Sequence, residues 1–209
     1  MLYKFRTLSS CKDLERVKDI IENGFYCNDF ISFNDMNEGV YTHNKNSQTN
    51  LFSEKYKYKI CSFSKESALN NELMWGHYAD AGKGLVIEVE VDEKIEEFMK
   101  DITYTSELES FETFLDTILT TKTLAWSYES ECRYINNRGE DNEVIIGKVT
   151  KIYFGTPYEI LENYEDILEK NRSLQKYHLY KNELKDYLSS TSICYEDYSF
   201  EDLGSSNEG

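Results

Sequence analysis

Residues 60–91, ICSFSKESALNNELMWGHYADAGKGLVIEVEV, decide the fold. Residues 60–64 have the pattern of a short strand, and residues 71–79 have an apolar side with helical spacing. A Gly-Lys-Gly sequence ends this helix, and residues 85–91 then alternate apolar and acidic side chains as a half-buried strand does. The order strand, helix, strand predicts a helix packed on a sheet.

Two serines lie in the first of these strands. Strand parity predicts Ser62 and Ser64 on one face of the sheet and Cys61 and Phe63 on the other. Hydroxyl groups at a strand end, just before an aromatic-rich helix, suit the wall of a pocket. Serines that simply face water are the alternative, and spacing alone leaves both interpretations open.

The remaining chain adds elements to this core. Strands are predicted at residues 2–6, 25–33, 54–60, 131–135, 144–154 and 176–181, and helices at residues 12–22, 92–100, 107–121 and 158–170. We predict an α/β protein of the α+β type, in which the strands at 2–6, 60–64, 85–91 and 131–135 share one curved mixed sheet system flanked by helices. Residues 1–195 are predicted to be a single domain, and residues 196–209 an acidic, mobile tail.

Composition limits the function classes. With a formal net charge of -16 in 209 residues, the chain repels phosphate backbones, so general nucleic-acid binding is not expected. No apolar run approaches the length of a membrane span, and the first residues lack the apolar core of a signal peptide. We therefore expect a cytoplasmic protein that does not bind membranes.

Cysteine and histidine are few and scattered. The five cysteines include no Cys-x-x-Cys, and the three histidines are not spaced as a metal-binding pair on one helix face. We expect reduced cysteines, those in strands acting as small buried hydrophobes, and no metal site.

A row of lysines occupies residues 54–60. Lys55, Lys57 and Lys59 alternate with apolar side chains, a pattern that protects an exposed strand or, alternatively, attracts an anion. A polar turn, FNDMNEG, precedes this segment at residues 33–39. Asn34 and Asp35 suit plain turn chemistry, but their side chains can also hold a loop against a ligand.

Residues 124–136, LAWSYESECRYIN, carry a row of charges. If the strand is regular, Glu129, Glu131 and Arg133 share one face. Such a row is costly to bury unless its members are paired or used. One interpretation is an exposed face on which Arg133 balances a glutamate. The other is catalysis, in which one carboxylate orients a substrate hydroxyl and the other acts as base.

Several of these motifs together resemble the bacterial family known as domain of unknown function 2971. The matching motifs are LYKFR, FND, SFS, LMWGHYADAGKG, WSYESECRY and IYFG, and the resemblance covers the chain from residue 2 to about residue 188. The chain departs from the family's usual pattern at Met36, where a proline is common. The family carries no assigned activity, and the resemblance suggests a toxin-like or phage-defence effector.

A second resemblance is to ADP-ribosyltransferase folds, which carry an early-strand Arg, then Ser-x-Ser, then Glu-x-Glu. Here Arg6, Ser62-Phe63-Ser64 and Glu129-Ser130-Glu131 follow that order. The resemblance implies NAD as substrate.

The roles that this resemblance implies are as follows. Arg6 would bind a phosphate or ribose of NAD. Ser62 would support the nicotinamide pocket, and Ser64 would brace the catalytic strand. Glu131 would stabilise the oxocarbenium-like transition state, and Glu129 would orient or deprotonate the acceptor. The nicotinamide would be bordered by side chains from the central stretch, namely Phe63, His77 or Tyr78, whereas Trp75 is better explained by core packing.

Two functions therefore stay open. The first is an NAD-dependent ADP-ribosyltransferase or NAD-cleaving effector whose ligand is a nucleotide and whose acceptor is unidentified. The second is a non-catalytic binding module of the same fold that recognises a small anion or a protein partner. A nuclease fits less well, because the charge is strongly negative and the sequence has no acidic metal cluster.

Overall fold

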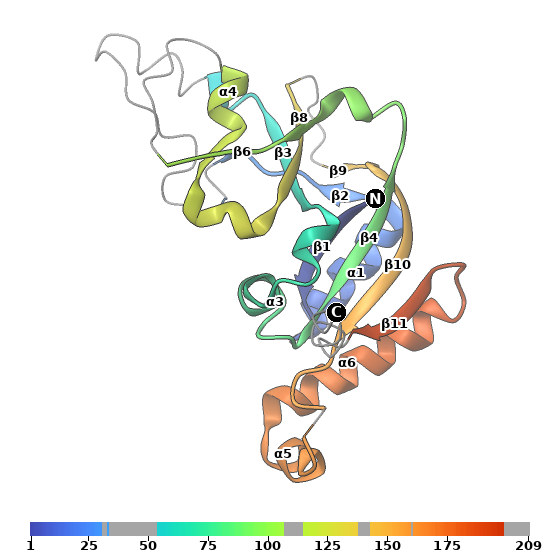
Figure 1. Cartoon of the computed structure of the whole chain (residues 1–209). Helices are drawn as coiled ribbons and strands as arrows, with labels where there is room; N and C mark the ends of the chain where they lie inside the picture. Colours follow the sequence, from blue (N-terminus) through green and yellow to red (C-terminus); the bar gives the residue numbers. More distant parts are fainter. Residues whose placement is uncertain (31–32, 34–53, 107–114, 138–142, 160, 199–209) are drawn as a thin grey trace, which may run out of the picture.

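The large sheet of this protein has seven strands in the order β11-β10-β4-β1-β3-β8-β5 (Figure 1). The computed structural model describes residues 1–30, 33, 54–106, 115–137, 143–159 and 161–198. The strand bounds are β1 (Leu2–Thr7), β3 (Lys59–Ser64), β4 (Gly84–Val91), β5 (Met99–Asp101), β8 (Glu131–Asn136), β10 (Gly147–Gly155) and β11 (Cys194–Tyr198). Neighbouring strands are antiparallel, except that β11 runs parallel to β10. The sheet is thus mixed, and the four strands predicted to share it do so.

Two small sheets and several helices complete the described residues. β2 (Phe25–Tyr26) pairs with β9 (Glu143–Val144), and β6 (Thr103–Thr105) pairs with β7 (Thr121–Thr123). The α-helices are α1 (Cys11–Asn23), α3 (Glu72–Tyr78), α4 (Leu115–Leu119), α5 (Tyr164–Lys170) and α6 (Arg172–Leu188), and the 3-10 helices are η2 (Glu66–Ala68), η3 (Glu96–Phe98) and η4 (Leu124–Glu129).

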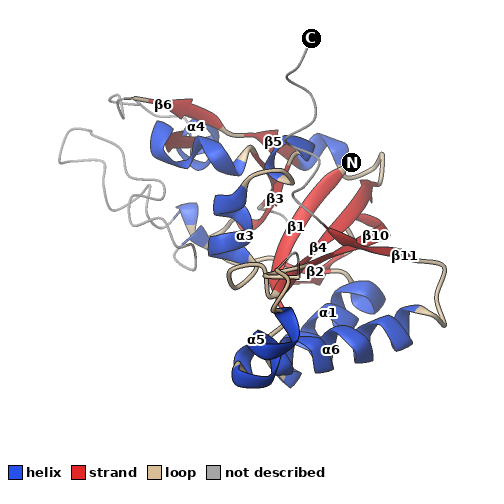
Figure 2. Ribbon diagram, turned by 60° about the horizontal axis from the view of Figure 1, so that its bottom comes forward, coloured by secondary structure: helices blue, strands red, loops and turns tan. Residues whose placement is uncertain are grey.

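Helices cover both faces of the sheet (Figure 2). On one face α1 and α6 bury apolar side chains against the sheet, and Leu14 and Leu174 are fully buried there with Ile87 of β4. On the other face α3 buries Trp75 against Phe5 of β1, with the two rings 5.5 Å apart at their centroids. This alternation along β1 and β4 is what the period-two pattern of the sequence predicts.

A fork opens in the middle of the sheet. β1 and β4 pair along six residues, whereas β1 and β3 pair only at Tyr3 and Ser64. Beyond that pair the two strands separate, so their facing edges do not complete a ladder. The fork leaves room for a pocket at the centre of the sheet.

Two predictions of secondary structure are wrong, because the side-chain pattern in a short window of sequence indicated a different element from the one that forms. Residues 92–100 were expected to be helical, but they form a turn, η3 and β5. Residues 176–181 alternate as a strand would, yet they lie inside α6. The buried positions of α6, Leu174, Tyr177, Lys181, Leu184 and Leu188, have helical spacing that becomes visible only over the longer window.

Three other predicted boundaries change. Among the described residues of the segment 25–33, where one strand was expected, β-structure is limited to β2 and an isolated bridge at Asn28. The lysine row is not a strand before Lys59; Lys55 is buried, with its ammonium 4.0 Å from the ring centre of Phe30. In the segment 107–121 the described helical part, α4, ends at Leu119, and in the segment 158–170 the helix α5 begins only at Tyr164.

The tail does not begin at residue 196. Residues 196–198 belong to β11, which pairs with β10, and the Tyr198 ring stacks on Trp75 at 5.0 Å. Asp197 forms ion pairs with Lys181 and Lys185 at 3.0 Å and 2.9 Å. The apolar and charged anchors of β11 therefore extend the folded domain to Tyr198, and residues 199–209 lie outside the described part of the chain.

Candidate functional site

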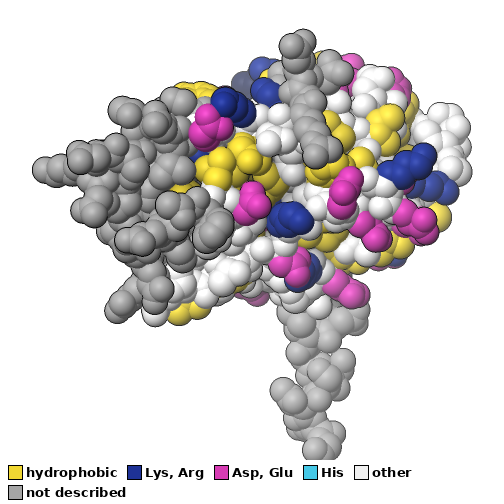
Figure 3. All heavy atoms as spheres, turned by 90° about the horizontal axis from the view of Figure 1, so that it is seen from above, with side chains coloured by type: hydrophobic (Ala, Val, Ile, Leu, Met, Phe, Trp, Pro, Cys, Tyr) yellow, Lys and Arg dark blue, Asp and Glu magenta, His cyan; other side chains and the backbone are white. Residues whose placement is uncertain are grey.

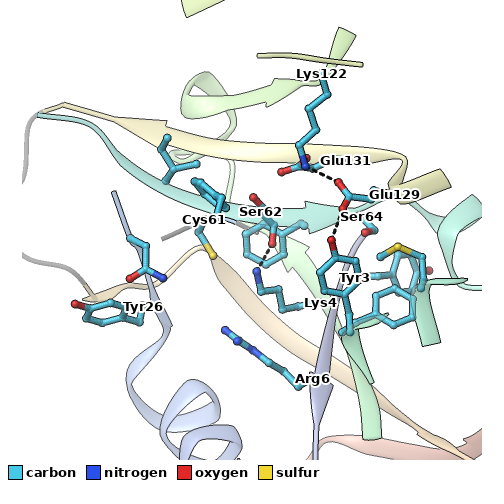
Figure 4. Close-up of a pocket in the computed structure, with 17 residues that line it drawn as sticks. Tyr3, Lys4, Arg6, Tyr26, Cys61, Ser62, Ser64, Lys122, Glu129 and Glu131 are labelled. Carbon is cyan, nitrogen blue, oxygen red and sulfur yellow. Dashed lines mark hydrogen bonds and ion pairs between the residues drawn. The ribbon is translucent and has the colours of Figure 1, made fainter. Parts of the chain in front are cut away.

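A pocket of about 310 Å³ lies in the fork between β1 and β3 (Figure 4). Its walls come from β1, β3, α3, η4 and the start of β8. The lining residues are Tyr3, Lys4, Phe5, Arg6, Tyr26, Asn28, Phe33, Ile60, Cys61, Ser62, Phe63, Ser64, Met74, Tyr78, Lys122, Glu129 and Glu131. Its volume is at the lower end of the range for small-molecule sites.

One end of the pocket carries two cations from β1. Lys4 and Arg6 are two residues apart, so both side chains leave the strand on the same face. The Lys4 ammonium donates a hydrogen bond to the carbonyl oxygen of Ser62. Burial lowers the pKa of both side chains. These cations thus stand in a desolvated environment, in which an anionic ligand gains more than it does in water.

Two buried polar atoms at this wall lack a partner among the described residues. They are Arg6 Nε and Ser62 Oγ. A buried donor or hydroxyl that makes no hydrogen bond costs free energy, unless a water molecule or a ligand supplies the missing partner. Both residues line the pocket, so a polar ligand there can supply the missing partner.

The other end of the pocket carries two carboxylates. Glu129 ends η4 and Glu131 begins β8, and between them Ser130 adopts a left-handed conformation with φ 44°. This turn, rather than a regular strand, brings both glutamates toward Lys122. The Lys122 ammonium lies 2.6 Å from Glu129 Oε2 and 2.8 Å from Glu131 Oε2.

Arg133 completes the cluster and is fully buried behind Glu131. Its Nε and Nη2 donate to Glu131 Oε1 and Oε2 at 2.6 Å and 3.2 Å. Burial opposes ionisation of Glu131, but the charges of Arg133 and Lys122 outweigh it and lower the pKa to about 2. Glu131 is therefore ionised at neutral pH.

Glu129 differs from Glu131 in its surroundings. Burial raises its pKa, and Lys122 only partly offsets this effect. The Tyr78 hydroxyl donates to Glu129 Oε1. Two buried carboxylates in one cluster thus have pKa values shifted in opposite directions, which is how a base and an electrostatic stabiliser are commonly distinguished.

A chain of hydrogen-bonding side chains leads from Glu129 toward the surface. Tyr78 also forms a hydrogen bond with Tyr128, and the Tyr128 hydroxyl lies 3.0 Å from Nδ1 of the exposed His77. Hydroxyl groups both donate and accept, so such a chain can pass a proton between a buried carboxylate and solvent.

Helix α3 places the aromatic wall. The Asn71 side chain accepts a hydrogen bond from the Leu73 backbone N–H at 3.0 Å and so caps the helix. Met74 and Tyr78, four residues apart, then face the pocket from successive turns. Trp75 lies in the core, and its indole N–H donates to the Leu69 carbonyl at 2.8 Å. The prediction that Trp75 belongs to the core is confirmed.

The structure brings together most of the predicted site residues. Those that line the pocket are Arg6, Ser62, Phe63, Ser64, Tyr78, Glu129 and Glu131. Ser64 also lies in one row with Tyr3 and Glu131, its partners on the two flanking strands. Neither His77 nor Arg133 lines the pocket, but His77 makes an edge-to-face ring contact with Tyr78 and Arg133 donates to Glu131. Asn34 and Asp35 lie outside the described residues.

Lys4 and Lys122 are pocket cations that the sequence interpretation missed. Lys4 could have been found, because it shares a strand face with Arg6. Lys122 has no comparable local signal, since it reaches the site only through the pairing of β7 with β6. Tyr104 of β6 was also missed; its hydroxyl accepts the backbone N–H of Glu131 at 2.8 Å.

Charged side chains of both signs mix on one face of the molecule. On the face shown in Figure 3, described lysine and arginine side chains lie among aspartates and glutamates. Among the described residues, no group of three or more His, Cys, Asp or Glu is arranged to hold a metal ion. Each helix in the described ranges is too short or too polar to span a membrane.

Comparisons of the chain with known protein families, with curated proteins and with solved structures give no match. The resemblances stated above therefore depend on the quoted motifs.

Proposed function

We propose that the pocket binds NAD through its nicotinamide mononucleotide half, and that the protein cleaves the bond between nicotinamide and ribose. ADP-ribose then passes to water or to an acceptor molecule. The observation that carries this proposal is the polarity of the pocket. Lys4 and Arg6 stand at one end and the ionised Glu131 at the other. The ligand half has matching charges, a phosphate anion and a pyridinium cation.

The two glutamates suit the two parts of this reaction. When the bond between ribose C1′ and the nicotinamide nitrogen breaks, its electron pair stays on that nitrogen, and positive charge develops on the ribose ring. The charge of Glu131 stabilises this oxocarbenium-like state. Glu129, with its raised pKa, is the better proton acceptor, and it takes the proton of the attacking acceptor hydroxyl.

The other pocket groups serve binding. The guanidinium of Arg6 suits bidentate contact with a phosphate, and Arg6 Nε has no partner among the described residues. Ser62 Oγ, buried and also without a described partner, suits a hydrogen bond to the carboxamide or ribose. Phe63 and Tyr78 supply apolar walls for a flat ring.

These assignments, together with the resemblance to the 2971 family, support an effector that consumes NAD or modifies a macromolecule, which we place in the cytoplasm. The resemblance suggests a toxin-like or phage-defence role. No metal is needed, because the leaving group is already cationic.

A second function, a non-catalytic module that binds a small anion, is favoured by one observation. Both oxygens of Glu131 are bound by cations of the chain itself, and this residue is only 4% exposed. A carboxylate held in this way is also typical of a structural ion pair. In such a module the cationic end of the pocket would bind the anion, and Glu129 and Glu131 at the other end would have a structural role only.

The test is release of free nicotinamide from NAD, measured alongside binding of NAD by calorimetry. The catalytic proposal expects release by the wild type and loss of roughly 10²–10³-fold of the rate in Glu131→Gln. Since Glu131→Gln leaves Arg133 buried without its partner, a second variant, Glu131→Gln/Arg133→Met, removes both charges of that pair. The remaining pair of Lys122 and Glu129 is then still balanced.

The outcomes separate the two functions. Binding of NAD without nicotinamide release by the wild type would establish the binding module. Full activity in a folded Glu131→Gln/Arg133→Met protein would exclude Glu131 from catalysis. Circular dichroism and thermal melting are the folding controls for each variant.

A further inference from the structure

Two buried cysteines face each other across neighbouring strand segments at the pocket wall. Asn28 and Ile60 exchange two backbone hydrogen bonds, at 2.9 Å and 2.7 Å. In an antiparallel pair, the residues next to such a hydrogen-bonded pair lie directly opposite each other. Cys27 therefore lies opposite Cys61. Both are buried; the Cys27 thiol donates to the carbonyl oxygen of Phe25 at 3.8 Å and also interacts with the Cys61 thiol.

The aromatic pair next to them confirms this register. Two residues beyond the Cys27–Cys61 pair, the same register places Phe25 opposite Phe63. The two rings meet edge to face, with their centroids 4.9 Å apart. Residues opposite each other at a non-hydrogen-bonded position have Cα atoms about 4.5 Å apart. That separation is within the range spanned by disulfides. Cys27 and Cys61 can thus be joined with little movement of the backbone.

Cys61 is the more reactive partner. It lines the pocket, with its sulfur near Lys4 and Arg6 (Figure 4). The hydrogen bond with Cys27, together with these two cations, lowers the pKa of Cys61 to about 6 against the opposing effect of burial. The pKa of Cys27 is raised by the same hydrogen bond and by burial. A thiolate is the nucleophilic form of cysteine, so the pair combines an attacking sulfur with a resolving thiol.

We propose that Cys27 and Cys61 form an oxidation site, in which hydrogen peroxide that enters the pocket converts the two thiols into a disulfide. The Cys61 thiolate attacks one peroxide oxygen, the O–O bond breaks, and the departing hydroxide takes a proton to become water. Cys61 is then a sulfenic acid. The Cys27 thiol sulfur then attacks the Cys61 sulfur and forms the S–S bond. The hydroxyl of the sulfenic acid leaves and, with the proton of the Cys27 thiol, becomes a second water. Two thiols are oxidised and one peroxide is reduced.

Oxidation changes the charge of the pocket. In the reduced protein the Cys61 thiolate partly neutralises Lys4 and Arg6. The disulfide carries no charge, so both cations become more available to an anion. The oxidised protein is therefore the form with higher affinity for phosphate groups. This consequence concerns the cationic end of the pocket alone and does not require NAD cleavage.

The experiment uses the full chain with Cys11→Ser and Cys194→Ser, because these two cysteines are exposed and would otherwise form links between molecules. The reduced protein is treated with hydrogen peroxide, unreacted thiols are alkylated under denaturing conditions, and tryptic peptides are identified by mass spectrometry. We expect a disulfide between the peptides at residues 19–45 and 60–65, and reversal by dithiothreitol.

Cys132 is the matched control within the same molecule. It is also buried, it lies opposite Phe63 in β8 rather than opposite a cysteine, and burial raises its pKa to about 12. Cys132 should stay reduced throughout. In Cys27→Ser, Cys61 should stop at the sulfenic acid, which a dimedone-type reagent traps.

Binding of inorganic pyrophosphate tests the consequence for the pocket. We expect at least a severalfold gain in affinity on oxidation of the parent protein and none in Cys61→Ser, which has no thiolate charge to lose. Failure of Cys27 and Cys61 to link, or oxidation of Cys132 at the same rate, would overturn the oxidation site. A disulfide that leaves pyrophosphate affinity unchanged would overturn its control of the pocket. NAD cleavage is not measured in either arm, so these outcomes are independent of the proposed function.

Discussion

The ammonium of Lys122 lies 2.6 Å from Glu129 Oε2, and both side chains are almost fully buried. The same ammonium also contacts Glu131, so a single lysine holds two carboxylates of unequal pKa at the edge of the pocket. A buried charge without its partner is far more costly than a buried pair. Lys122 is therefore expected to govern both the stability of the cluster and the ionisation of its two glutamates.

Substitution of Lys122 by methionine tests this role. Two carboxylates would then share Arg133, and the loss of a buried partner should lower the free energy of unfolding by about 3–5 kcal/mol. The measurement is urea unfolding at neutral pH. Lys57→Met is the control, because Lys57 pairs with Glu54 at 2.5 Å on the exposed surface, where a pair contributes about 1 kcal/mol or less. Equal losses of unfolding free energy in the two variants would show that the buried cluster contributes no more to stability than a surface ion pair does.

The lowered pKa of Glu131 predicts an acid-sensitive contribution to stability. Its pKa falls from 4.5 to about 2 in the folded chain. A carboxylate with a depressed folded pKa stabilises the fold fully above its unfolded pKa, and this stabilisation is lost as the pH falls toward the folded pKa. The contribution should be about 3 kcal/mol and should disappear between about pH 5 and pH 2.

The comparison protein for this prediction is Glu131→Gln/Arg133→Met. Glu129 acts in the opposite direction, because its raised pKa means that protonation favours the folded state. Both proteins keep Glu129, so the difference between their stabilities reports on Glu131. If the unfolding free energies of the wild type and of this double variant fell by the same amount from pH 5 to pH 2.5, the prediction would be contradicted.

The strands around the pocket could be predicted because their local pattern agrees with their final environment. Alternating side chains mark β1 and β4, whose opposite faces pack on different helices. The same kind of pattern correctly assigned Arg6 to β1 and Ser62 to β3. The site at Glu129 was predicted only in part. A regular strand was expected there, but the left-handed Ser130 ends η4 and starts β8.

The remaining features depend on contacts between distant segments. Lys122 and Tyr104 lie on β7 and β6, whose parallel pairing brings them to Glu131 from separate parts of the chain. The opposition of Cys27 and Cys61 likewise results from an isolated bridge between segments 32 residues apart, Asn28 and Ile60. Spacing along a single segment cannot predict such pairings.

Tyr78→Phe should separate transfer from hydrolysis if NAD is cleaved. The substitution removes the hydrogen bond from the Tyr78 hydroxyl that orients the Glu129 carboxylate. A carboxylate that is no longer held toward the acceptor should be a less effective base. We expect transfer to an acceptor to fall by about 10-fold or more, with a smaller loss in nicotinamide release.

A matched tyrosine controls for the loss of a hydroxyl. Tyr187 donates to the Glu22 carboxylate at 2.9 Å on the surface, away from the pocket. Tyr187→Phe should leave transfer and nicotinamide release unchanged. Comparable losses of transfer and release in Tyr78→Phe would mean that Tyr78 holds the whole pocket rather than the base. The assay pairs labelling of a cell extract with nicotinamide release.

Truncation should show that residues 196–198 belong to the folded domain. Deletion of residues 196–209 removes the stacking of Tyr198 on Trp75 and the ion pairs of Asp197 with two lysines. Since Lys181 is buried, its loss of Asp197 adds to the cost, and we expect a loss of roughly 3 kcal/mol or more. Deletion of residues 199–209 keeps β11, so the difference in melting temperature between the two truncations isolates these three residues. Identical melting temperatures would restore the tail boundary at residue 196.

Arg6→Lys should weaken ligand binding while the fold stays intact. Lysine keeps the positive charge but cannot reproduce the guanidinium fork, so affinity for NAD should fall by about 10-fold or more. Stability should not fall, because the substitution removes Nε, which is buried without a partner among the described residues. Arg172→Lys, on the exposed first residue of α6, is the control for an arginine-to-lysine change. Calorimetric titration with NAD and thermal melting measure the two effects. An unchanged affinity would place the ligand away from Arg6, and a large drop in melting temperature would assign the guanidinium to the structure of the sheet rather than to the pocket.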